Sequence, residues 1–267
     1  MFDSGFGGLT VARAVIDLLP DEHLVYIGDT GRYPYGPRPL NEVREFAGEL
    51  AKSLVDDYDV KLIVVACNTA AAAGLEPLLA ELPVPVVTVI EPGARALVAS
   101  TRTGRIGVIG TVGTIGSGAY QRAVTATGAF ADLTCSACPG FVEFVERGET
   151  TGEQITILAE RLLAPLADAK VDTLLLGCTH YPFLARVIGE VMGRDVVLVS
   201  SADETAFEVR DVLTRLGLER PRGAEAARHL FLSSGNVDLF AALGQRLLGP
   251  ELARTEPWTP SGQEDRR

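Results

Sequence analysis

The segment KLIVVACNTA (61–70) runs from a strongly apolar stretch into a cysteine that is followed by polar and small residues. A second segment, DTLLLGCTHY (172–181), repeats this order, and its cysteine lies 178 − 67 = 111 positions later. Unbroken runs of Val, Ile and Leu favour strands that are buried on both faces, as in parallel sheets. The repeated pattern therefore predicts a duplicated α/β half, with one cysteine at the end of a strand in each half.

The rest of the 267-residue chain alternates short apolar runs with amphipathic segments. Strands are predicted at 24–28, 61–66, 85–90, 105–110, 172–177, 195–200 and 229–234, and helices at 9–19, 42–57, 69–82, 114–127, 152–167, 183–192, 203–217 and 236–248. This alternation predicts an α/β fold with crossover connections and mainly parallel sheets. The glycine-rich segment 107–118 is predicted to be mostly a turn that begins a second domain. The polar stretch 253–267 is expected to be partly disordered.

The bulk composition excludes several classes of function. The net charge is −11, and no segment concentrates Lys and Arg, which argues against nucleic acid and anionic membranes as ligands. The longest apolar stretch, 62–75, is too short and too interrupted to span a bilayer, and the N-terminus lacks a signal segment. We therefore expect a cytoplasmic protein with reduced thiols, for which four cysteines are too few to make a disulfide scaffold.

Cys67 and Cys178 allow several interpretations. Each could be a small buried hydrophobe, as free cysteines often are. However, ligands of α/β sheets bind at the carboxyl ends of strands, where both cysteines are expected, and this favours a functional role. The CSAC segment (135–138) contains a pair of cysteines, but the sequence has no second Cys or His pair that could complete a zinc site with it. Packing is the simpler role for these two cysteines. A cysteine hydrolase using Cys178 and His180 would leave Cys67 unexplained.

Two turn-rich segments could complete a binding site. DSGFGGLT (3–10) leads into a helix, and its backbone N–H groups, with Asp3 and Ser4, could face a small polar ligand. It lacks the last glycine of a dinucleotide fingerprint, so we expect no dinucleotide there. DTGRYPYGPRP (29–39) follows a predicted strand and could cover the mouth of a cleft.

Seven segments together resemble the glutamate racemases of the aspartate/glutamate racemase superfamily. They are FDSGFGGLTV (2–11), GDTGRYPYG (28–36), VVACNTA (64–70), GRIGVIGT (104–111), CPGFVEFVERG (138–148), LLLGCTHYP (174–182) and VSSADETA (199–206). They follow one another over nearly the whole chain, and the stretch 12–31 looks most like actinobacterial members. The family usually has more residues before FDSG, so the first strand is expected to be short or its start trimmed.

The resemblance implies two pseudo-symmetric α/β domains with the active site in the cleft between them. Domain 1 would combine 1–91 with 204–267 and carry Cys67, and domain 2 would be 92–203 and carry Cys178. The implied catalytic residues are Cys67, Cys178, Asp3, His180 and Glu146, and the implied substrate-binding residues are Asp3, Ser4, Tyr35, Gly36, Asn68, Thr69, Thr179 and His180. Glu146 matches the family's site glutamate, with Glu143 as the fallback. His180 favours glutamate over aspartate as substrate.

Racemisation explains why two cysteines are needed. A proton leaves one face of Cα and another arrives on the opposite face, so two acid/base groups must flank the carbon. A thiolate is a suitable base, and the two thiols would exchange roles with the substrate enantiomer. We expect the helix N-termini that follow Cys67 and Cys178 to lower the thiol pKa values. His180 and Asp3 would assist proton transfer on the Cys178 and Cys67 sides.

The resemblance also implies that no cofactor and no metal are needed. Pyridoxal phosphate would require a Schiff-base lysine, and none of the three lysines, Lys52, Lys61 and Lys170, lies in a matched segment. The implied product is D-glutamate for peptidoglycan, made by a homodimer. Two other functions stay open: a related racemase acting on aspartate or a hydantoin, and a protein that binds DNA gyrase, as some members of the family do.

Overall fold

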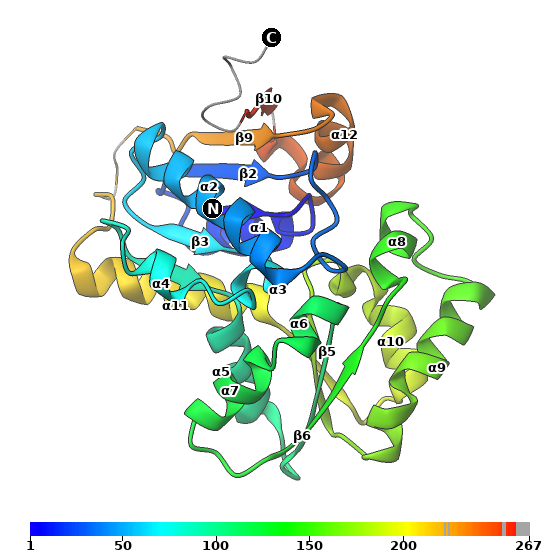
Figure 1. The fold of residues 1–267 in the computed structure, drawn as a ribbon. Coiled ribbons are helices and arrows are strands. Elements are labelled where there is room, and N and C mark those ends of the chain that lie inside the picture. Colours follow the sequence, from blue (N-terminus) through cyan, green and yellow to red (C-terminus); the bar gives the residue numbers. More distant parts are fainter. Residues whose placement is uncertain (222, 224, 253–254, 260–267) are drawn as a thin grey trace.

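Two parallel sheets organise the computed structural model, which describes residues 1–221, 223, 225–252 and 255–259 (Figure 1). Across these residues the first sheet has six strands in the order β10-β9-β2-β1-β3-β4, and the second has four in the order β6-β5-β7-β8. The first sheet contains β1 (Phe2–Asp3), β2 (Leu24–Gly28), β3 (Ile63–Val65), β4 (Val86–Thr88), β9 (His229–Ser233) and β10 (Thr255–Pro257). The second contains β5 (Arg105–Gly110), β6 (Asp132–Ala137), β7 (Thr173–Gly177) and β8 (Val197–Ser200). The predicted α/β class is confirmed.

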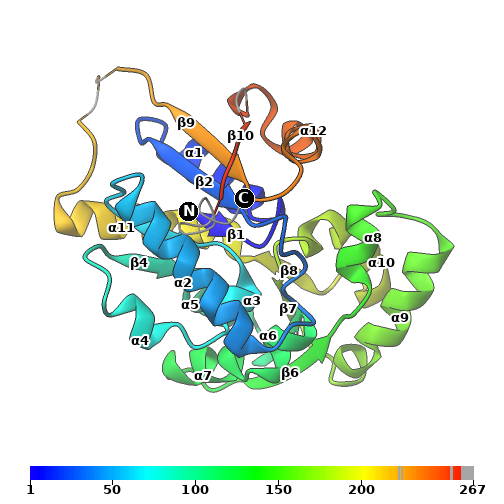
Figure 2. The ribbon, with the colours of Figure 1, turned by 45° about the horizontal axis from the view of Figure 1, so that its top comes forward.

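Helices cover the faces of both sheets (Figures 1 and 2). Their bounds are α1 (Leu9–Leu18), α2 (Leu40–Asp56), α3 (Asn68–Ala71), α4 (Glu76–Leu79), α5 (Ile90–Ser100), α6 (Val112–Gly116), α7 (Ala119–Ala126), α8 (Phe141–Glu146), α9 (Glu153–Asp168), α10 (Ala185–Met192), α11 (Ser201–Leu216) and α12 (Val237–Leu248), with 3₁₀ turns at Tyr181–Leu184 and Gly249–Glu251. Helix α11 contacts both α1 and α5, so it joins the layers of the two sheets. No helix in the described ranges is long and apolar enough to cross a membrane.

The apolar pattern explains why these elements pack as they do. The helix predicted at 42–57 is confirmed as α2, and its residues Val43, Ala47, Leu50 and Leu54 form a completely buried apolar stripe. Strand β7 is buried along its whole length, as its unbroken apolar run predicts. In the first sheet, Phe2 of the two-residue β1 pairs with Ile27 and Val65, so this short strand lies between β2 and β3. The strands of the first sheet come from 2–88 and 229–257, and those of the second from 105–200; the domain boundaries themselves stay a prediction.

Several predicted elements were wrong in detail. The helix expected at 69–82 is two short helices, α3 and α4, which are separated by a turn at Gly74. The helix expected at 114–127 is likewise broken, at Gly118, whose φ is +70°. Residues 107–118 form the end of β5 and helix α6 rather than mostly a turn. Strand β6 and helix α5 were not predicted at all.

The C-terminal stretch 253–267, which is expected to be partly disordered, contains one ordered strand. Residues 255–257 form β10, which pairs with β9 in parallel, whereas 253–254 and 260–267 lie outside the described residues. The Trp258 side chain is buried in the hydrophobic core that the first sheet shares with α2. Its indole N–H donates to Ser53 Oγ at 2.9 Å. One large aromatic residue thus anchors the end of the described chain to α2.

Replacing Trp258 with alanine should therefore lower the free energy of unfolding by about 3–5 kcal/mol, because a buried indole and its hydrogen bond are lost. Urea denaturation followed by circular dichroism measures this change. The matched control is Phe130→Ala, since Phe130 is fully exposed and its removal should change stability by less than about 0.5 kcal/mol. Equal effects of the two variants would show that the C-terminal segment does not stabilise the fold.

Candidate active site

A pocket of about 590 Å³, counted with its solvent-open part, lies where the carboxyl ends of strands from both sheets meet. Nine of the predicted site residues line it: Ser4, Tyr35, Gly36, Cys67, Asn68, Thr69, Cys178, Thr179 and His180. The lining within the described chain does not include Asp3 or Glu146. The loop 33–37 also forms part of the wall, as expected for the segment that follows β2. The structure therefore brings both halves of the predicted site together at one cavity.

Cys67 enters the pocket from the first sheet. It follows β3 by two residues and is the N-cap of α3, where its sulfur accepts the backbone N–H of Ala70 at 3.4 Å. The thiol also lies 3.7 Å from the hydroxyl of Ser4. Only 4% of the residue is exposed. The sulfur is thus held by a backbone donor and a neighbouring hydroxyl at the wall of the pocket.

Cys178 enters from the second sheet, directly after β7. Its Sγ lies 4.0 Å from Nδ1 of His180, and Nε2 of His180 lies 2.8 Å from Oε1 of Glu146 on α8. His180 is almost completely buried, whereas Glu146 is a quarter exposed. Glu143 lines the pocket instead. Of the two glutamates considered from the sequence, Glu146 is the one that contacts His180.

Asp3 connects the two cysteine-bearing halves from behind the pocket. Its Oδ1 accepts the N–H of Gly5 at 2.8 Å, and its Oδ2 accepts the hydroxyl of Thr179 at 3.2 Å. Burial raises the pKa of this carboxyl, while the charge of His180 acts in the opposite direction. Because Thr179 follows Cys178, the Asp3–Thr179 bond fixes the β1 turn against the segment that carries the second thiol.

A second contact between the halves involves hydroxyl groups. Thr69 Oγ1 lies 2.9 Å from Thr111 Oγ1 and 3.2 Å from Thr114 Oγ1, and both partners belong to the start of α6. Thr111 lines the pocket beside Thr69. Sequence reasoning missed these partners, although the capping pattern of GTVGT marks Thr111 as the residue before a helix.

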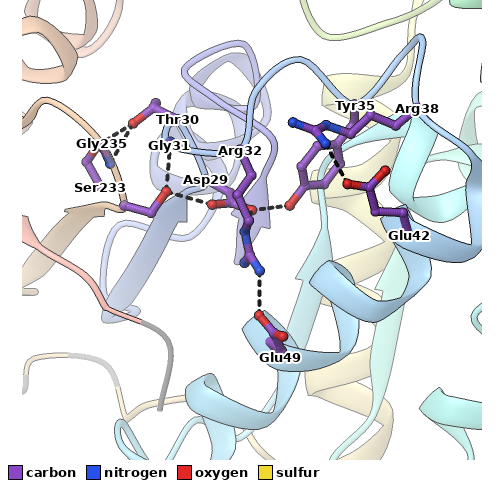
Figure 3. Close-up of polar contacts among 11 residues, drawn as sticks. Asp29, Thr30, Gly31, Arg32, Tyr35, Arg38, Glu42, Glu49, Ser233 and Gly235 are labelled. Carbon is purple, nitrogen blue, oxygen red and sulfur yellow. Dashed lines mark hydrogen bonds and ion pairs between the residues drawn. The ribbon is translucent and has the colours of Figure 1, made fainter. Parts of the chain in front are cut away.

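Asp29 is fully buried. Its polar contacts fix the loop that follows β2 (Figure 3). Its carboxylate accepts hydrogen bonds from the Tyr35 hydroxyl, from Arg32 Nε at 2.7 Å and from Ser234 Oγ at 2.6 Å. Arg32 also pairs with Glu49 on α2. The hydroxyl of Tyr35, a predicted substrate ligand, is therefore engaged with Asp29. Sequence reasoning did not identify Asp29 because its partner Ser234 lies 205 positions away.

Backbone N–H groups at the two helix starts lower the thiol pKa values, as expected, but burial of the thiols outweighs this effect. Burial raises the pKa of Cys67 to about 12, and the charge of Asp3 adds to this, whereas the Ala70 N–H lowers it. Burial also raises the pKa of Cys178, and backbone N–H groups again oppose the shift without cancelling it. Helix α3 is only four residues long, and a 3₁₀ turn begins at Tyr181, so neither terminus carries a large dipole. Both thiols are therefore protonated near neutral pH in this structure.

The other two cysteines, Cys135 and Cys138, are not joined by a disulfide in the structure. All four cysteines are free, with Cys135 on β6 and Cys138 just after it. Among the described residues, no three His, Cys, Asp or Glu side chains are grouped so that they could hold a metal ion. Cys138 is buried and also lines the pocket, so its role combines packing with forming the wall.

Residues 9–208 match the Asp/Glu/Hydantoin racemase family. The sequence is 54% identical to the glutamate racemase of Mycobacterium ulcerans over 98% of this chain and 96% of that protein. The chain belongs to the glutamate racemases of this family. The predicted isomerase class and the resemblance to actinobacterial members are thereby confirmed.

Solved structures of glutamate racemases have the same fold. Glutamate racemase isoform RacE1 from Bacillus anthracis superimposes with a TM-score of 0.90 at 42% identity, covering 97% of this chain and 96% of that one. The glutamate racemase of Francisella tularensis, solved in complex with D-glutamate, gives a TM-score of 0.89 at 29% identity, with the same coverage of both chains.

The raised pKa of Cys67 predicts how stability depends on pH. A thiol with an ordinary pKa near 9.0 ionises in the unfolded chain, but in the folded chain it stays protonated until about pH 12. Stability that is fully present below pH 9 is therefore lost as the pH rises. Between pH 7.5 and 10 the native protein should lose about 1.4 kcal/mol more free energy of unfolding than Cys67→Ser.

Urea denaturation at both pH values measures this difference. Tyrosines titrate in both proteins, so their contribution cancels. Between pH 5 and 7.5 no cysteine titrates in either state, and the two stability curves should run parallel there. If the free energies of unfolding of the native protein and of Cys67→Ser ran parallel up to pH 10, Cys67 would not be a buried thiol with a raised pKa.

Proposed function

We propose that this protein interconverts L- and D-glutamate by proton transfer at Cα, with Cys67 and Cys178 as the two acid/base groups. One observation carries the proposal: two buried thiols, which follow strands of different sheets, line the same pocket. Inversion at a single carbon needs one acid/base group on each face of that carbon. Each half of the molecule supplies one thiol to the pocket, which meets this need.

The pocket suits a small dicarboxylate through neutral donors. No lysine or arginine of the described chain belongs to its lining, which instead offers hydroxyl and amide groups from Ser4, Asn68 and Thr69 and the backbone N–H of Thr179. Such groups can hold carboxylates when they are preorganised and shielded from water. The relative from Francisella tularensis was solved with D-glutamate, which supports glutamate as the substrate here. The family as a whole also includes enzymes acting on aspartate and hydantoins, so the substrate is the first property to test.

The raised pKa values have a chemical consequence for this reaction. A thiolate derived from a thiol with a high pKa is a strong base, and the Cα–H of an amino acid is a very weak acid. Burial therefore makes the thiolate rarer but more reactive once it forms. The substrate ammonium group would favour the charged thiolate when it enters the pocket. In each turnover one sulfur removes the proton while the other, still a thiol, delivers one to the opposite face.

His180, Glu146 and Asp3 would support the two thiols. His180 can exchange a proton with Cys178 across their 4.0 Å contact, and Glu146 orients the imidazole through Nε2. Asp3 lies close enough to Cys67 for its charge to raise the thiol pKa. We propose Glu146 as a positioning residue, because it contacts His180 and not the pocket.

The chemistry is proposed to proceed without a cofactor. None of Lys52, Lys61 and Lys170 lines the pocket, and Lys61 instead pairs with Glu22 at 2.6 Å. No lysine of this chain is therefore placed to form a Schiff base with pyridoxal phosphate at this site. We further propose that the D-glutamate made here supplies peptidoglycan synthesis. The homodimer and the contact with DNA gyrase stay predictions.

Incubation of the protein with L-glutamate in D₂O, without cofactor, tests the reaction. Optical rotation should be lost while D-glutamate appears with deuterium at Cα. Early in the reaction the deuterium should be in the product and not in the remaining substrate, because a different thiol protonates each face. Exchange with aspartate but not glutamate would instead assign this protein to the aspartate branch.

Each cysteine can then be tested separately. Cys67→Ser and Cys178→Ser should each lower kcat by about 10²–10⁴-fold, because a hydroxyl is a much weaker acid than a thiol. The matched control is Cys135→Ser on β6, a half-buried cysteine outside the pocket lining, which should keep kcat within about 2-fold. A fully active and folded Cys178→Ser variant would rule out the two-thiol mechanism.

The two glutamates of α8 give different expectations. Glu146→Gln removes the carboxylate that holds His180, so kcat should fall by about 10-fold with little change in KM. Glu143→Gln removes a charge from the pocket wall and should alter KM for the anionic substrate more than kcat. Steady-state kinetics in both directions distinguishes them. If Glu143→Gln lowered kcat and Glu146→Gln did not, the assignment of Glu146 would be reversed.

A further inference from the structure

Tyr120 on α7 lies outside the pocket lining, although it contacts both cysteine-bearing segments. Its side chain is fully buried. A Cβ added at Gly177 would lie only 3.0 Å from Tyr120 Cε2 and 2.7 Å from the carbonyl oxygen of Ile109. Glycine directly before Cys178 thus leaves room for the tyrosine ring at the end of β7.

The hydroxyl of Tyr120 reaches the other half of the molecule. It donates to Oδ1 of Asn68 at 2.5 Å. Asn68 directly follows Cys67 and opens α3. A single side chain therefore packs beside the residue that precedes one thiol and binds the residue that follows the other.

This hydrogen bond determines which end of the Asn68 amide is free. Oδ1 is occupied by Tyr120, whereas the buried Nδ2 has no hydrogen-bond partner among the described residues. Only 3% of Asn68 is exposed, and the residue lines the pocket. A buried amide nitrogen without an acceptor is costly, and it is satisfied when a ligand brings an acceptor such as a carboxylate oxygen.

The opposite amide orientation is disfavoured by Tyr120. Burial raises the pKa of this phenol, so the hydroxyl keeps its proton and must donate it. Oδ1 of Asn68 is the acceptor that the structure gives it. If the amide were flipped, the phenol proton would face N–H groups, and an oxygen would face the substrate carboxylate.

We propose that Tyr120 is a positioning residue that fixes the Asn68 amide with its N–H groups toward a carboxylate of the substrate. This inference rests on the proposed function, because it assumes that a carboxylate of glutamate enters this pocket. Tyr120 lies 52 positions from Asn68 in the sequence. The segments that carry Cys67 and Cys178 therefore do not contain the residue that orients the amide.

Tyr120→Phe keeps the ring and removes only the hydroxyl, so the protein should stay folded. KM for L-glutamate should rise by about 10-fold, while kcat stays within about 3-fold, because ground-state carboxylate binding is affected. In an Asn68→Ser background the same substitution should change KM by less than about 2-fold. A purely structural role of Tyr120 would give the same change in both backgrounds, which would overturn the proposal.

The matched control is Tyr26→Phe. Tyr26 is also fully buried, and its hydroxyl donates to the carbonyl of Gly5 at 2.9 Å. Any change in KM from Tyr26→Phe should be the same in the native protein and in the Asn68→Ser background. The expected coupling is therefore specific to the tyrosine that binds the amide.

A second variant tests the amide without changing Tyr120. Asn68→Asp can still accept the Tyr120 hydroxyl, but it turns an oxygen toward the substrate, so KM should rise at least about 10-fold more than in Asn68→Ser. Equal KM values in the two variants would contradict a donor at this position. Racemisation of glutamate by the native protein tests the proposed function separately, so a native enzyme with normal activity and no Tyr120–Asn68 coupling would overturn this inference alone.

Discussion

Both thiols follow fully buried parallel strands, and this placement governs the rest of the site. Strands β3 and β7 end with their last residues inside the protein, so Cys67 and Cys178 are almost entirely shielded from bulk water. Parallel sheets place all carboxyl ends on one edge, and two such edges that face each other form the pocket. The apolar runs that build the cores therefore also place the two thiols at the pocket and bury them there.

Burial and hydrogen bonding act on these thiols in opposite directions. Backbone N–H groups near each sulfur favour the thiolate, whereas desolvation favours the thiol and prevails at both positions. In the proposed reaction this balance would suit a base that removes a proton from a weak carbon acid, since a thiolate derived from a thiol of low pKa is a weaker base. The described lining of the pocket contains no lysine or arginine. Under the proposed mechanism, the positive charge that favours the thiolate would therefore come from the ammonium group of the substrate.

The sequence predicted what is encoded locally. Long apolar runs predicted the strands, and amphipathic segments predicted helices such as α2. The positions of the two cysteines and their polar neighbours, just after predicted strands, predicted the pocket. Helix α5 was missed because it contains Pro92, which is tolerated only because it lies in the first turn, and because packing against α11 and β7 stabilises the helix. Strand β6, DLTCSA, is only half buried and has no continuous apolar run. The partners that orient the site are distant in sequence: Ser234 for Asp29, and Tyr120 for Asn68.

The hydrogen bonds that complete the site are also those that join the two sheets. Thr179 donates to Asp3, Tyr120 donates to Asn68, and Gly113 N–H donates to the carbonyl of Gly36 at 3.0 Å. Each bond links a residue from the second half of the site to one from the first, and each involves a residue that lines the pocket. A relative movement of the sheets would therefore disturb the thiol geometry, the amide donor and the covering loop together. Neither half can hold the site alone, because the residues beside each thiol are oriented in part by the half that carries the other.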